Sequence, residues 1–365
     1  MRNLIKFILL MVVLIVSANS YGTDYYIPHN GIANHAAPGI VGSIAWYFAN
    51  YGNPGNRFFL TSSADYNINS TLTVPSQTRF DSTVGSTAFV KATSVLDDGV
   101  MIIMSDNSSI YNMNIHANRY ARHCIVANGK TNVTIDSVVA QKTKNNYTSG
   151  DPTPHVIYCK DATKVTIRNC TLRRAGSDPK LNPRDWNGTA DLICASNNYD
   201  LLILENNLAY ALTAGVQMGQ TRKAGVNNNI IQHTGLNNLY STAFHSSDGI
   251  TAYHNMSHPE GGGPYMISGN EICYYNNNGI HVSGHNITIK ENDIYSGAHR
   301  AIYLGDIKDN PECSHELLIY NNYLTAGSDP PNNHRIFFRN YDPFTTSVYG
   351  NTPNDVNEHS GTCTP

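Results

Sequence analysis

The sequence predicts an all-β fold of the parallel solenoid type, in which short strands stack coil upon coil. First, apolar and polar residues alternate over short segments, which is the period of a half-buried strand. Second, one such strand returns at a regular interval, with Ile280 and Ile302 in equivalent positions 22 residues apart (302 − 280). Third, an asparagine recurs in one slot of successive repeats, at Asn206, Asn229, Asn270, Asn292 and Asn322.

Each repeat contains two recognisable strand motifs. The longer one reads apolar-x-apolar-x-x-Asn-x-apolar, and its second apolar position is filled by Ile203, Val226, Ile267, Ile289 and Ile319. Copies around Ile110, Ile135 and Ile167 keep the apolar frame without the asparagine. The shorter one recurs at 125–127, 157–159, 216–218, 250–252, 280–282, 302–304 and 336–338. Because an asparagine tolerates a left-handed turn and its amide can bond equivalent amides in adjacent coils, we expect an asparagine ladder.

The N-terminal segment has the pattern of an export signal. Arg2 and Lys6 precede an apolar run over 7–16, and Ala18-Asn19-Ser20 provides a small-x-small cleavage site. This pattern predicts a signal peptide over residues 1–20 and a secreted or periplasmic protein. The apolar run is too short for a stable membrane anchor, so we expect none.

The composition argues against a nucleic-acid partner. Removing two basic residues with the signal peptide changes the net charge to (24 − 2) − 27 = −5, and charged residues make up only 14% of the chain. A mildly acidic protein of this kind lacks the positive field that binds nucleic acid nonspecifically. We expect a monomer that binds an acidic polysaccharide or oligosaccharide.

Both ends of the solenoid need protection, because an open end exposes unpaired strand edges. We assign residues 21–75 to an N-terminal cap region, in which residues 38–51 carry apolar side chains at helical spacing. The parallel β-helix is assigned to residues 76–340. Residues 341–365 lack the repeat and are assigned to a C-terminal tail packed on the end of the solenoid.

The seven cysteines are sparse for this length, and none has the spacing of a zinc site. We interpret Cys159 and Cys194 as stacked core residues in one inward column of adjacent coils. An oxidising compartment favours a disulfide between Cys313 and Cys363 that ties down the C-terminal tail.

Insertions and outward side chains locate a candidate site. The connections 141–155, 176–190, 234–248, 254–264 and 306–316 are longer than the repeat requires, and such insertions build the walls of a cleft. The middle residue of each short strand should point outward, which selects Gln217, Thr251, His281, Tyr303 and Phe337.

These features resemble the secreted right-handed parallel β-helix proteins of the pectate-lyase-like superfamily, over roughly residues 60–340. The resemblance implies a right-handed parallel β-helix with a short N-terminal capping helix, and a carbohydrate ligand. That superfamily contains polysaccharide lyases, glycoside hydrolases, uronate epimerases and phage tailspikes. The polygalacturonase motifs and the Tyr-Gly-Phe-Asp-Pro-His motif of mannuronan epimerases are absent, so the reaction must be argued from side chains.

The clustered residue types favour a polysaccharide lyase that cleaves a uronate-containing polysaccharide by β-elimination. This reaction needs a cation beside the sugar carboxylate, a base for the C5 proton and an acid for the departing oxygen. Arg300 suits the first role, His281 or His245 the second and Tyr303 the third. The predicted catalytic residues are His245, Asp248, His281, Arg300 and Tyr303, and the predicted substrate-binding residues are Arg174, His233, Tyr253, Tyr274, His299 and Arg335.

Other functions stay open at this point. Inverting hydrolysis requires two carboxylates, and its candidates Asp191, Asp248 and Asp306 form no compact pair in the sequence. An epimerase on the same fold, or a noncatalytic glycan-binding protein, would use the same face. Asp248 precedes a glycine and could instead form an Asx turn. The metal ligands stay unknown, and the sequence leaves open whether Ca²⁺ is a cofactor.

Overall fold

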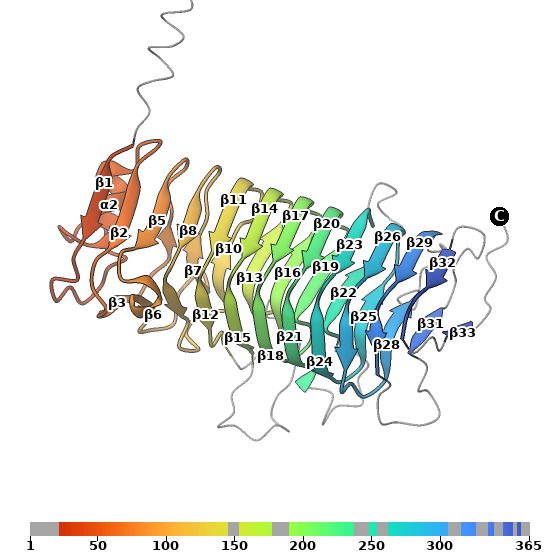
Figure 1. Cartoon of the computed structure of the whole chain (residues 1–365). Coiled ribbons are helices and arrows are strands. Elements are labelled where there is room, and N and C mark those ends of the chain that lie inside the picture. The colour runs from red at the N-terminus through yellow and green to blue at the C-terminus, as the bar shows by residue number, and fades with distance from the viewer. Residues whose placement is uncertain are drawn as a thin grey trace, which may run out of the picture.

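The chain forms an elongated stack of coils built from three parallel sheets (Figure 1). The computed structural model describes residues 22–144, 153–176, 190–236, 248–253, 262–305, 315–325, 335–338, 346–352 and 356–358. The three sheets are called A, B and C here, and their strands are given below. Each central coil contributes a strand to sheet C, then to sheet A and then to sheet B, and returns to sheet C one level further along. The predicted all-β parallel β-helix with one short N-terminal helix is therefore confirmed.

Sheet A has twelve strands: β1 (Asp24–Ile27), β2 (Arg57–Leu60), β5 (Arg79–Ser82), β8 (Ser109–Tyr111), β11 (Thr131–Asp136), β14 (Thr163–Arg168), β17 (Tyr199–Leu204), β20 (Arg222–Asn227), β23 (Tyr265–Ser268), β26 (His285–Lys290), β29 (His315–Tyr320) and β32 (Thr346–Tyr349). Sheet B has ten: β3 (Asp65–Ile68), β6 (Phe89–Ala92), β9 (Asn114–His116), β12 (Val139–Gln141), β15 (Thr171–Ala175), β18 (Asn207–Ala211), β21 (Ile230–Thr234), β24 (Glu271–Tyr275), β27 (Asp293–Tyr295) and β30 (Tyr323–Leu324).

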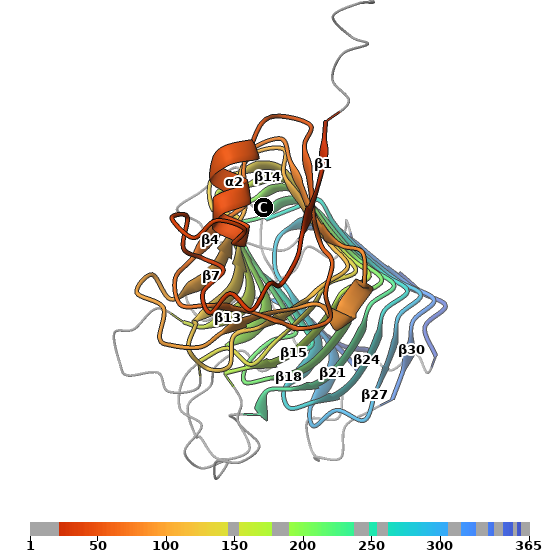
Figure 2. The same ribbon diagram turned by 90° about the vertical axis from the view of Figure 1, so that its left-hand side faces the viewer.

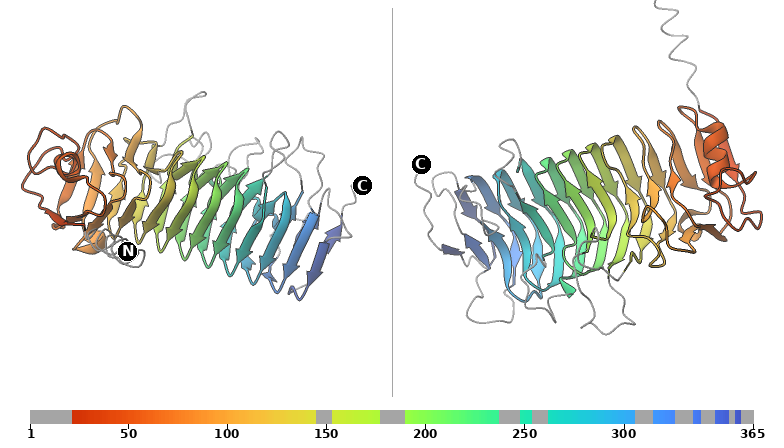
Figure 3. Two further views of the ribbon diagram at one scale, coloured as in Figure 1. Left: turned by 90° about the horizontal axis from the view of Figure 1, so that it is seen from above. Right: turned by 180° about the vertical axis from the view of Figure 1, so that it is seen from behind.

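Sheet C has eleven strands: β4 (Leu72–Thr73), β7 (Val100–Ile103), β10 (His123–Val126), β13 (His155–Lys160), β16 (Asp191–Ser196), β19 (Val216–Gly219), β22 (Ile250–Tyr253), β25 (Asn278–Val282), β28 (Arg300–Leu304), β31 (Ile336–Phe338) and β33 (Val356–Glu358). The described helices are α2 (Ile44–Tyr51) and the 3₁₀ turn η1 (Gly85–Thr87). Views from above and behind show the same uninterrupted stack of strands (Figure 3). No helix in the described parts of the chain is long and apolar enough to cross a membrane.

The strand register follows the repeat that the sequence predicts. In sheet C, Ile280 pairs with Ile302, and Ile302 pairs with Ile336. In sheet A, the second apolar positions pair in unbroken succession, from Ile203 through Val226, Ile267 and Ile289 to Ile319. These side chains are fully buried and fill the interior of the coils, where each residue packs on its equivalents above and below.

The asparagine ladder is present and has one rung more than predicted. Each Nδ2 donates to the Oδ1 of the next rung at 2.8–3.0 Å, from Asn206 through Asn229, Asn270, Asn292 and Asn322 to Asn351. The ladder side chains are buried, and each Oδ1 also accepts the backbone N–H of the preceding rung.

The expected left-handed conformation lies one residue earlier than the ladder. Glu205, Glu291 and Asn321, which precede rungs, have φ of 55–56°, whereas no ladder asparagine has a positive φ. The preceding residue makes the sharp turn between sheets A and B. The rung itself is then free to direct its amide inward along the solenoid axis.

Both ends differ from the sequence assignment. Helix α2 begins at Ile44, where the Ser43 hydroxyl accepts the Trp46 N–H at 3.0 Å, instead of at residue 38. It lies at the N-terminal end of the stack (Figure 2), where Phe48 packs on Phe58 and Phe80 at ring-centroid distances of 5.0 and 5.2 Å. Strands β1 to β4 of the predicted cap region already belong to the three sheets.

At the other end, the assignment of residues 341–365 to a tail without the repeat is wrong for part of that segment. Strand β32 pairs with β29, and β33 pairs with β31. Asn351 continues the ladder, although its coil lacks the full apolar motif.

The prediction for the cysteines is half right. Cys159 is buried in the core, but Cys194 pairs with Tyr158 and therefore lies in the neighbouring, outward column. Its coil places Ile193 and Ala195 inward, so the middle residue of that triplet faces out. Cys313, Cys363 and the predicted signal peptide lie outside the described residues, so the disulfide and the signal peptide both stay predictions.

Candidate functional site

The candidate site occupies the outer face of sheet C. Residues three apart along the chain meet there: the Asp248 carboxylate, just before β22, accepts the Thr251 hydroxyl at 2.9 Å, and Arg300 lies over the Tyr303 ring at 5.1 Å. Each coil therefore presents two outward columns. The first contains His123, His155, Asp191, Asp248, Asn278 and Arg300, and the second contains Tyr158, Cys194, Gln217, Thr251, His281, Tyr303 and Phe337.

A glycine between the two outward residues makes this three-residue spacing possible, because its backbone can approach the sheet B strands closely. A Cβ atom on Gly249 would lie 2.4 Å from Ile272 Cγ2 and 2.6 Å from the Gly279 carbonyl oxygen. The glycine after Asp248 is thus required by packing. The Asp248 carboxylate bonds to neighbouring side chains and to the next coil instead of to its own following backbone, so the Asx-turn alternative is not what the structure shows.

Asp248 and His281 form a buried acid–imidazole pair. Asp248 is fully buried, and its Oδ2 lies 3.2 Å from His281 Nδ1. Its Oδ1 accepts the Asn277 side-chain amide and both the backbone and side-chain N–H groups of Asn278, each at 3.0 Å. Because an ionised carboxylate only accepts, the bond to His281 fixes the imidazole proton on Nδ1. Nε2 of the neutral ring then carries the lone pair.

Tyr303 and Arg300 complete this cluster. The Tyr303 ring meets His281 edge-to-face at 4.6 Å, and the Arg300 guanidinium lies over Tyr303 at 5.1 Å and over Phe337 at 4.3 Å. Burial lowers the pKa of Arg300 from its usual value, with Tyr303 acting in the opposite direction. Arg300 Nε is buried and has no hydrogen-bond partner among the described residues. Such a cation is poised to gain from an anionic ligand.

The outward residues of this face are more enclosed than the sequence pattern indicates. Thr251 is 1% exposed, and Tyr303 and Phe337 are each 8% exposed. His281 retains some access, with 12% of its side chain exposed, and Arg300 is also only partly buried. The structure thus brings Asp248, His281, Arg300 and Tyr303 together, while His245 and Asp306 lie outside the described residues.

A second acid–imidazole pair on the same face was missed by the sequence analysis. His155 Nδ1 lies 3.2 Å from Asp191 Oδ2, but it accepts the Asp191 backbone N–H at 3.3 Å, and Oδ2 has no hydrogen-bond partner among the described residues. Asp191 Oδ1 accepts the Thr213 hydroxyl at 2.5 Å and the Ala214 N–H at 2.9 Å. The rings of His123, His155 and Tyr158 form a mutual cluster, with centroid distances of 5.1–5.5 Å between each two of them. Burial, reinforced by His155, lowers the pKa of His123 to about 3.

This second cluster is also where the described residues could hold a metal. His155, Asp191 and Cys194 each place one ligand atom within 4.8 Å of the other two. Imidazole, carboxylate and thiolate ligands suit zinc more than calcium. Sequence spacing could not reveal the set, because the insertion between the two coils hides that His155 and Asp191 share a register position.

The predicted substrate-binding residues fall into two groups. Tyr253 lies over Gly219 on the sheet C side; burial and the nearby Cys194 raise its pKa, and a hydrogen bond to Gln217 opposes them. His299 is half-buried on the turn before β28, and Arg335 Nε is buried next to β31 with no partner among the described residues. Arg174, His233 and Tyr274 instead form a column at the far end of the sheet B strands, each with a φ of 55–60°.

Comparison with known proteins identifies the fold. No protein-family model matches the sequence, and no curated protein matches it either. Solved structures do match: the A-module of the mannuronan C-5 epimerase AlgE4 from Azotobacter vinelandii has a TM-score of 0.63 at 13% identity, over 91% of this chain and 95% of that chain. The Dettilon tailspike protein reaches 0.64 at 14% identity, over 93% and 69% of the two chains. Pectate lyase Pel9A reaches 0.55 at 14% identity, over 82% and 77%.

The chain has the right-handed parallel β-helix fold of these proteins. At sequence identities of 13–14%, these similarities show the β-helix architecture and do not show which reaction the chain catalyses. An epimerase, a lyase and a tailspike share this β-helix, so the reaction has to be argued from the Asp248–His281 cluster itself.

Proposed function

We propose that this protein is a secreted polysaccharide lyase that cleaves a uronate-containing polysaccharide by β-elimination. The observation that carries the proposal is the contact between a carboxylate-oriented imidazole, a phenol and a partly buried arginine on one face. His281 touches Asp248 and Tyr303, and Arg300 lies against Tyr303. These are the three chemical roles that the elimination requires.

Arg300 pairs with the carboxylate of the sugar and makes the adjacent C5 proton more acidic. His281 Nε2 removes that proton, and Asp248 stabilises the imidazolium that forms. The electron pair of the C5–H bond becomes the C4–C5 double bond as the C4–O bond breaks. Tyr303 donates its phenolic proton to the departing oxygen. Asp248 acts through His281 and is a positioning residue.

Hydrolysis fits this cluster less well. An inverting mechanism needs one carboxylic acid to protonate the leaving group and one carboxylate to activate water. Both oxygens of Asp248 are already occupied by bonds from Asn277, Asn278, Thr251 and His281, so this group has no proton or lone pair directed at a substrate.

The test is incubation of the purified protein with pectate, alginate and glycosaminoglycans, while the ultraviolet absorbance of an unsaturated uronate is followed. We expect absorbance with at least one of these polymers. His281→Ala and Arg300→Ala should each lower turnover at least about a hundredfold, the effect of losing a general base or one transition-state contact. Tyr303→Phe should lower turnover and spare binding.

Matched controls come from the opposite end of the stack. His29→Ala and Arg57→Ala change residues that pair with the Asp65 carbonyl and with Asp24, far from sheet C of the central coils, and should leave turnover unchanged. New reducing ends without absorbance would overturn the lyase in favour of a hydrolase. Inversion at C5 without cleavage would indicate an epimerase, and binding alone a glycan-binding protein. Full activity of His281→Ala, with loss in His155→Ala, would move the centre to the second pair.

A further inference from the structure

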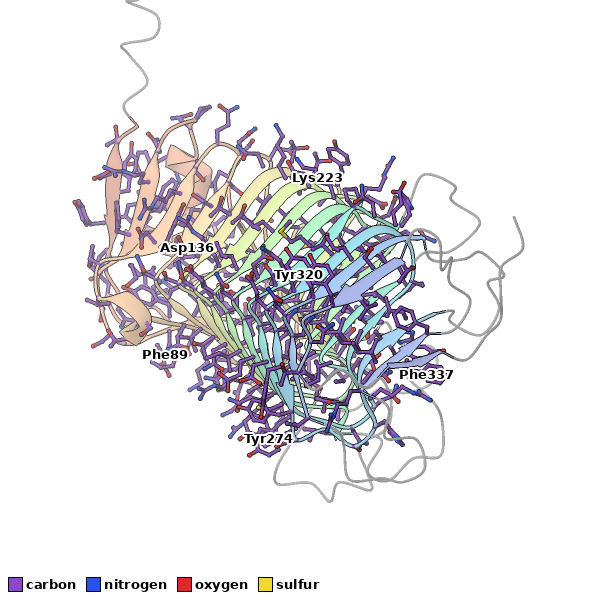
Figure 4. All side chains as sticks on the ribbon, turned by 45° about the vertical axis from the view of Figure 1, so that its right-hand side comes forward. Phe89, Asp136, Lys223, Tyr274, Tyr320 and Phe337 are labelled. Atoms are coloured by element: carbon purple, nitrogen blue, oxygen red, sulfur yellow. The ribbon has the colours of Figure 1, made fainter. Side chains whose placement is uncertain are left out.

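A ladder of aromatic rings runs along the outside of the β-helix where the sheet B strands end. The rings of Tyr210 and His233 stack at 4.9 Å with an interplanar angle of 2°, and those of His233 and Tyr274 at 4.8 Å and 6°. All three residues have a left-handed backbone, with φ of 55–67°, which turns each side chain out of the sheet. Tyr274 is 53% exposed and lies on the outer edge of the solenoid (Figure 4).

The ladder stops at Tyr274 because the next coil supplies a small residue. Strand register pairs Cys273 with Tyr295, so Ser296 occupies the following rung, again with a left-handed φ of 54°. The missing ring leaves one face of Tyr274 without a stacking partner from that rung. A hollow of about 280 Å³ lies beside it, lined by the turn residues 233–236, 274–276 and 296–298 of three coils.

Two buried hydroxyls belong to residues that line this hollow and have no partner. Thr234 and Tyr275 are each 2% exposed, and neither Thr234 Oγ1 nor Tyr275 Oη has a hydrogen-bond partner among the described residues. A buried hydroxyl without a partner is unfavourable, so such groups normally bind water or a ligand. Burial raises the pKa of Tyr275, which keeps its proton available for donation.

The lining contains no charged side chain, since His233 is its one titratable group apart from the tyrosines and burial lowers the pKa of His233. The hollow thus offers one flat aromatic face and no fixed charge, and two of its lining residues carry buried hydroxyls without partners. Its volume is below the roughly 300–1,000 Å³ of pockets for drug-sized ligands, which limits it to a small ring. A pyranose has the matching chemistry, with an apolar face of C–H groups and an edge of hydroxyls.

We propose that the hollow at the end of the ring ladder is a sugar subsite that takes one pyranose ring in the position of the missing rung. The ring stacks on the free face of Tyr274, and its hydroxyls bond to Thr234 and Tyr275. The inference rests on the proposed function only for the choice of a uronate as the natural sugar. The subsite lies at the end of sheet B, outside the outer face of sheet C where Asp248 and His281 sit.

Titration calorimetry and saturation-transfer NMR with galacturonate, mannuronate, glucuronate, galactose and glucose test the subsite. We expect the wild-type chain to bind at least one of these monosaccharides at millimolar concentration. Tyr274→Ala should weaken binding at least about tenfold, while Tyr274→Phe should retain it because the stacking face remains. Thr234→Val and Tyr275→Phe should each weaken it about 2- to 12-fold, the equivalent of about 0.5–1.5 kcal/mol.

The sharpest variant is Ser296→Tyr, which supplies the missing rung. Tyr210 and Tyr274 already place tyrosine in this left-handed position, so the new ring should stack on Tyr274, abolish sugar binding and leave the melting temperature unchanged or higher. Tyr323→Ala, which removes an equally exposed tyrosine from β30, is the matched control and should bind as wild type.

The subsite is overturned if the wild-type chain binds none of the five sugars, or if Ser296→Tyr and Tyr274→Ala both bind as wild type. These outcomes are separable from the fate of the lyase. Tyr274-dependent sugar binding without any elimination product leaves the subsite standing and removes the lyase. Elimination whose KM is unchanged in Ser296→Tyr, together with unchanged monosaccharide binding, removes the subsite and leaves the lyase.

Discussion

Replacing Asn292 with alanine removes one inner rung of the asparagine ladder. Its Nδ2 donates to the Ile267 carbonyl at 3.0 Å, to the Lys290 carbonyl at 3.0 Å and to Asn322 Oδ1 at 2.9 Å. Its Oδ1 accepts the backbone N–H and the side-chain amide of Asn270, at 3.0 and 2.9 Å. Asn292 is 1% exposed, so water cannot replace these partners in the intact coil.

The magnitude follows from the groups that are left behind. The Asn270 N–H becomes a buried donor without a partner, at a cost of about 1–3 kcal/mol. Two carbonyl contacts at about 0.5–1.5 kcal/mol each are also lost. We therefore expect Asn292→Ala to lower the free energy of unfolding by about 2–6 kcal/mol, a large part of the roughly 5–15 kcal/mol that holds a native protein together.

Urea unfolding followed by circular dichroism measures the change. Asn50→Ala is the matched control, because Asn50 is exposed on α2 and makes one bond, to the Trp46 carbonyl at 2.9 Å; it should stay within about 0.5 kcal/mol of wild type. Equal, negligible shifts in both variants would refute the reasoning. They would mean that water satisfies these groups in the unfolded chain as well as the ladder does in the folded one.

Two further outcomes follow from burial. Ile289→Asp puts an unpaired charge into a fully buried core position and should prevent folding or secretion, as judged by soluble yield; normal yield would show that the inward register is wrong. His123 has a pKa lowered to about 3 from 6.5, so the unfolded state binds the proton first. Its contribution is fully present above pH 6.5 and is lost as the pH falls from 6.5 towards 3, in total about 4–5 kcal/mol. His123→Asn should flatten the decline of the melting temperature over that window, and an unchanged decline would assign acid sensitivity to other groups.

The repeat could be predicted because it follows from elementary periodicity. Inward isoleucines alternate with polar residues, and any coil that broke the alternation would bury a polar side chain or expose an apolar one. The ends were harder to predict. Asn351 continues the ladder from a coil whose apolar motif is incomplete, and strands β1 and β2 enter sheet A before any repeat is recognisable in the sequence.

Only some of the side chains on the outer face of sheet C could be placed from the sequence. The short-strand motif identified His281 and Tyr303, because the middle residue of such a strand faces out. It could not show that Asp248, three residues before Thr251, lies on the same face, since strict alternation would place it differently. Only the packing of Gly249 against Ile272 and Gly279 explains that register.

The two acid–imidazole pairs of sheet C are too far apart to act on one bond. His155 lies in β13 and His281 in β25, four strand steps apart, which at about 4.8 Å for each step is roughly 19 Å. A single sugar cannot span that distance, so the two imidazoles cannot act on the same sugar. The pair at His281 has Arg300 over the neighbouring Tyr303 ring. His155 and Asp191 instead have Cys194 within reach of a shared ligand and His123 stacked on His155, and Arg122 acts on His123 from outside the pair. In the proposed elimination a uronate carboxylate needs a cation beside it, and the half-buried Arg300 next to Tyr303 makes His281 the stronger candidate for the base.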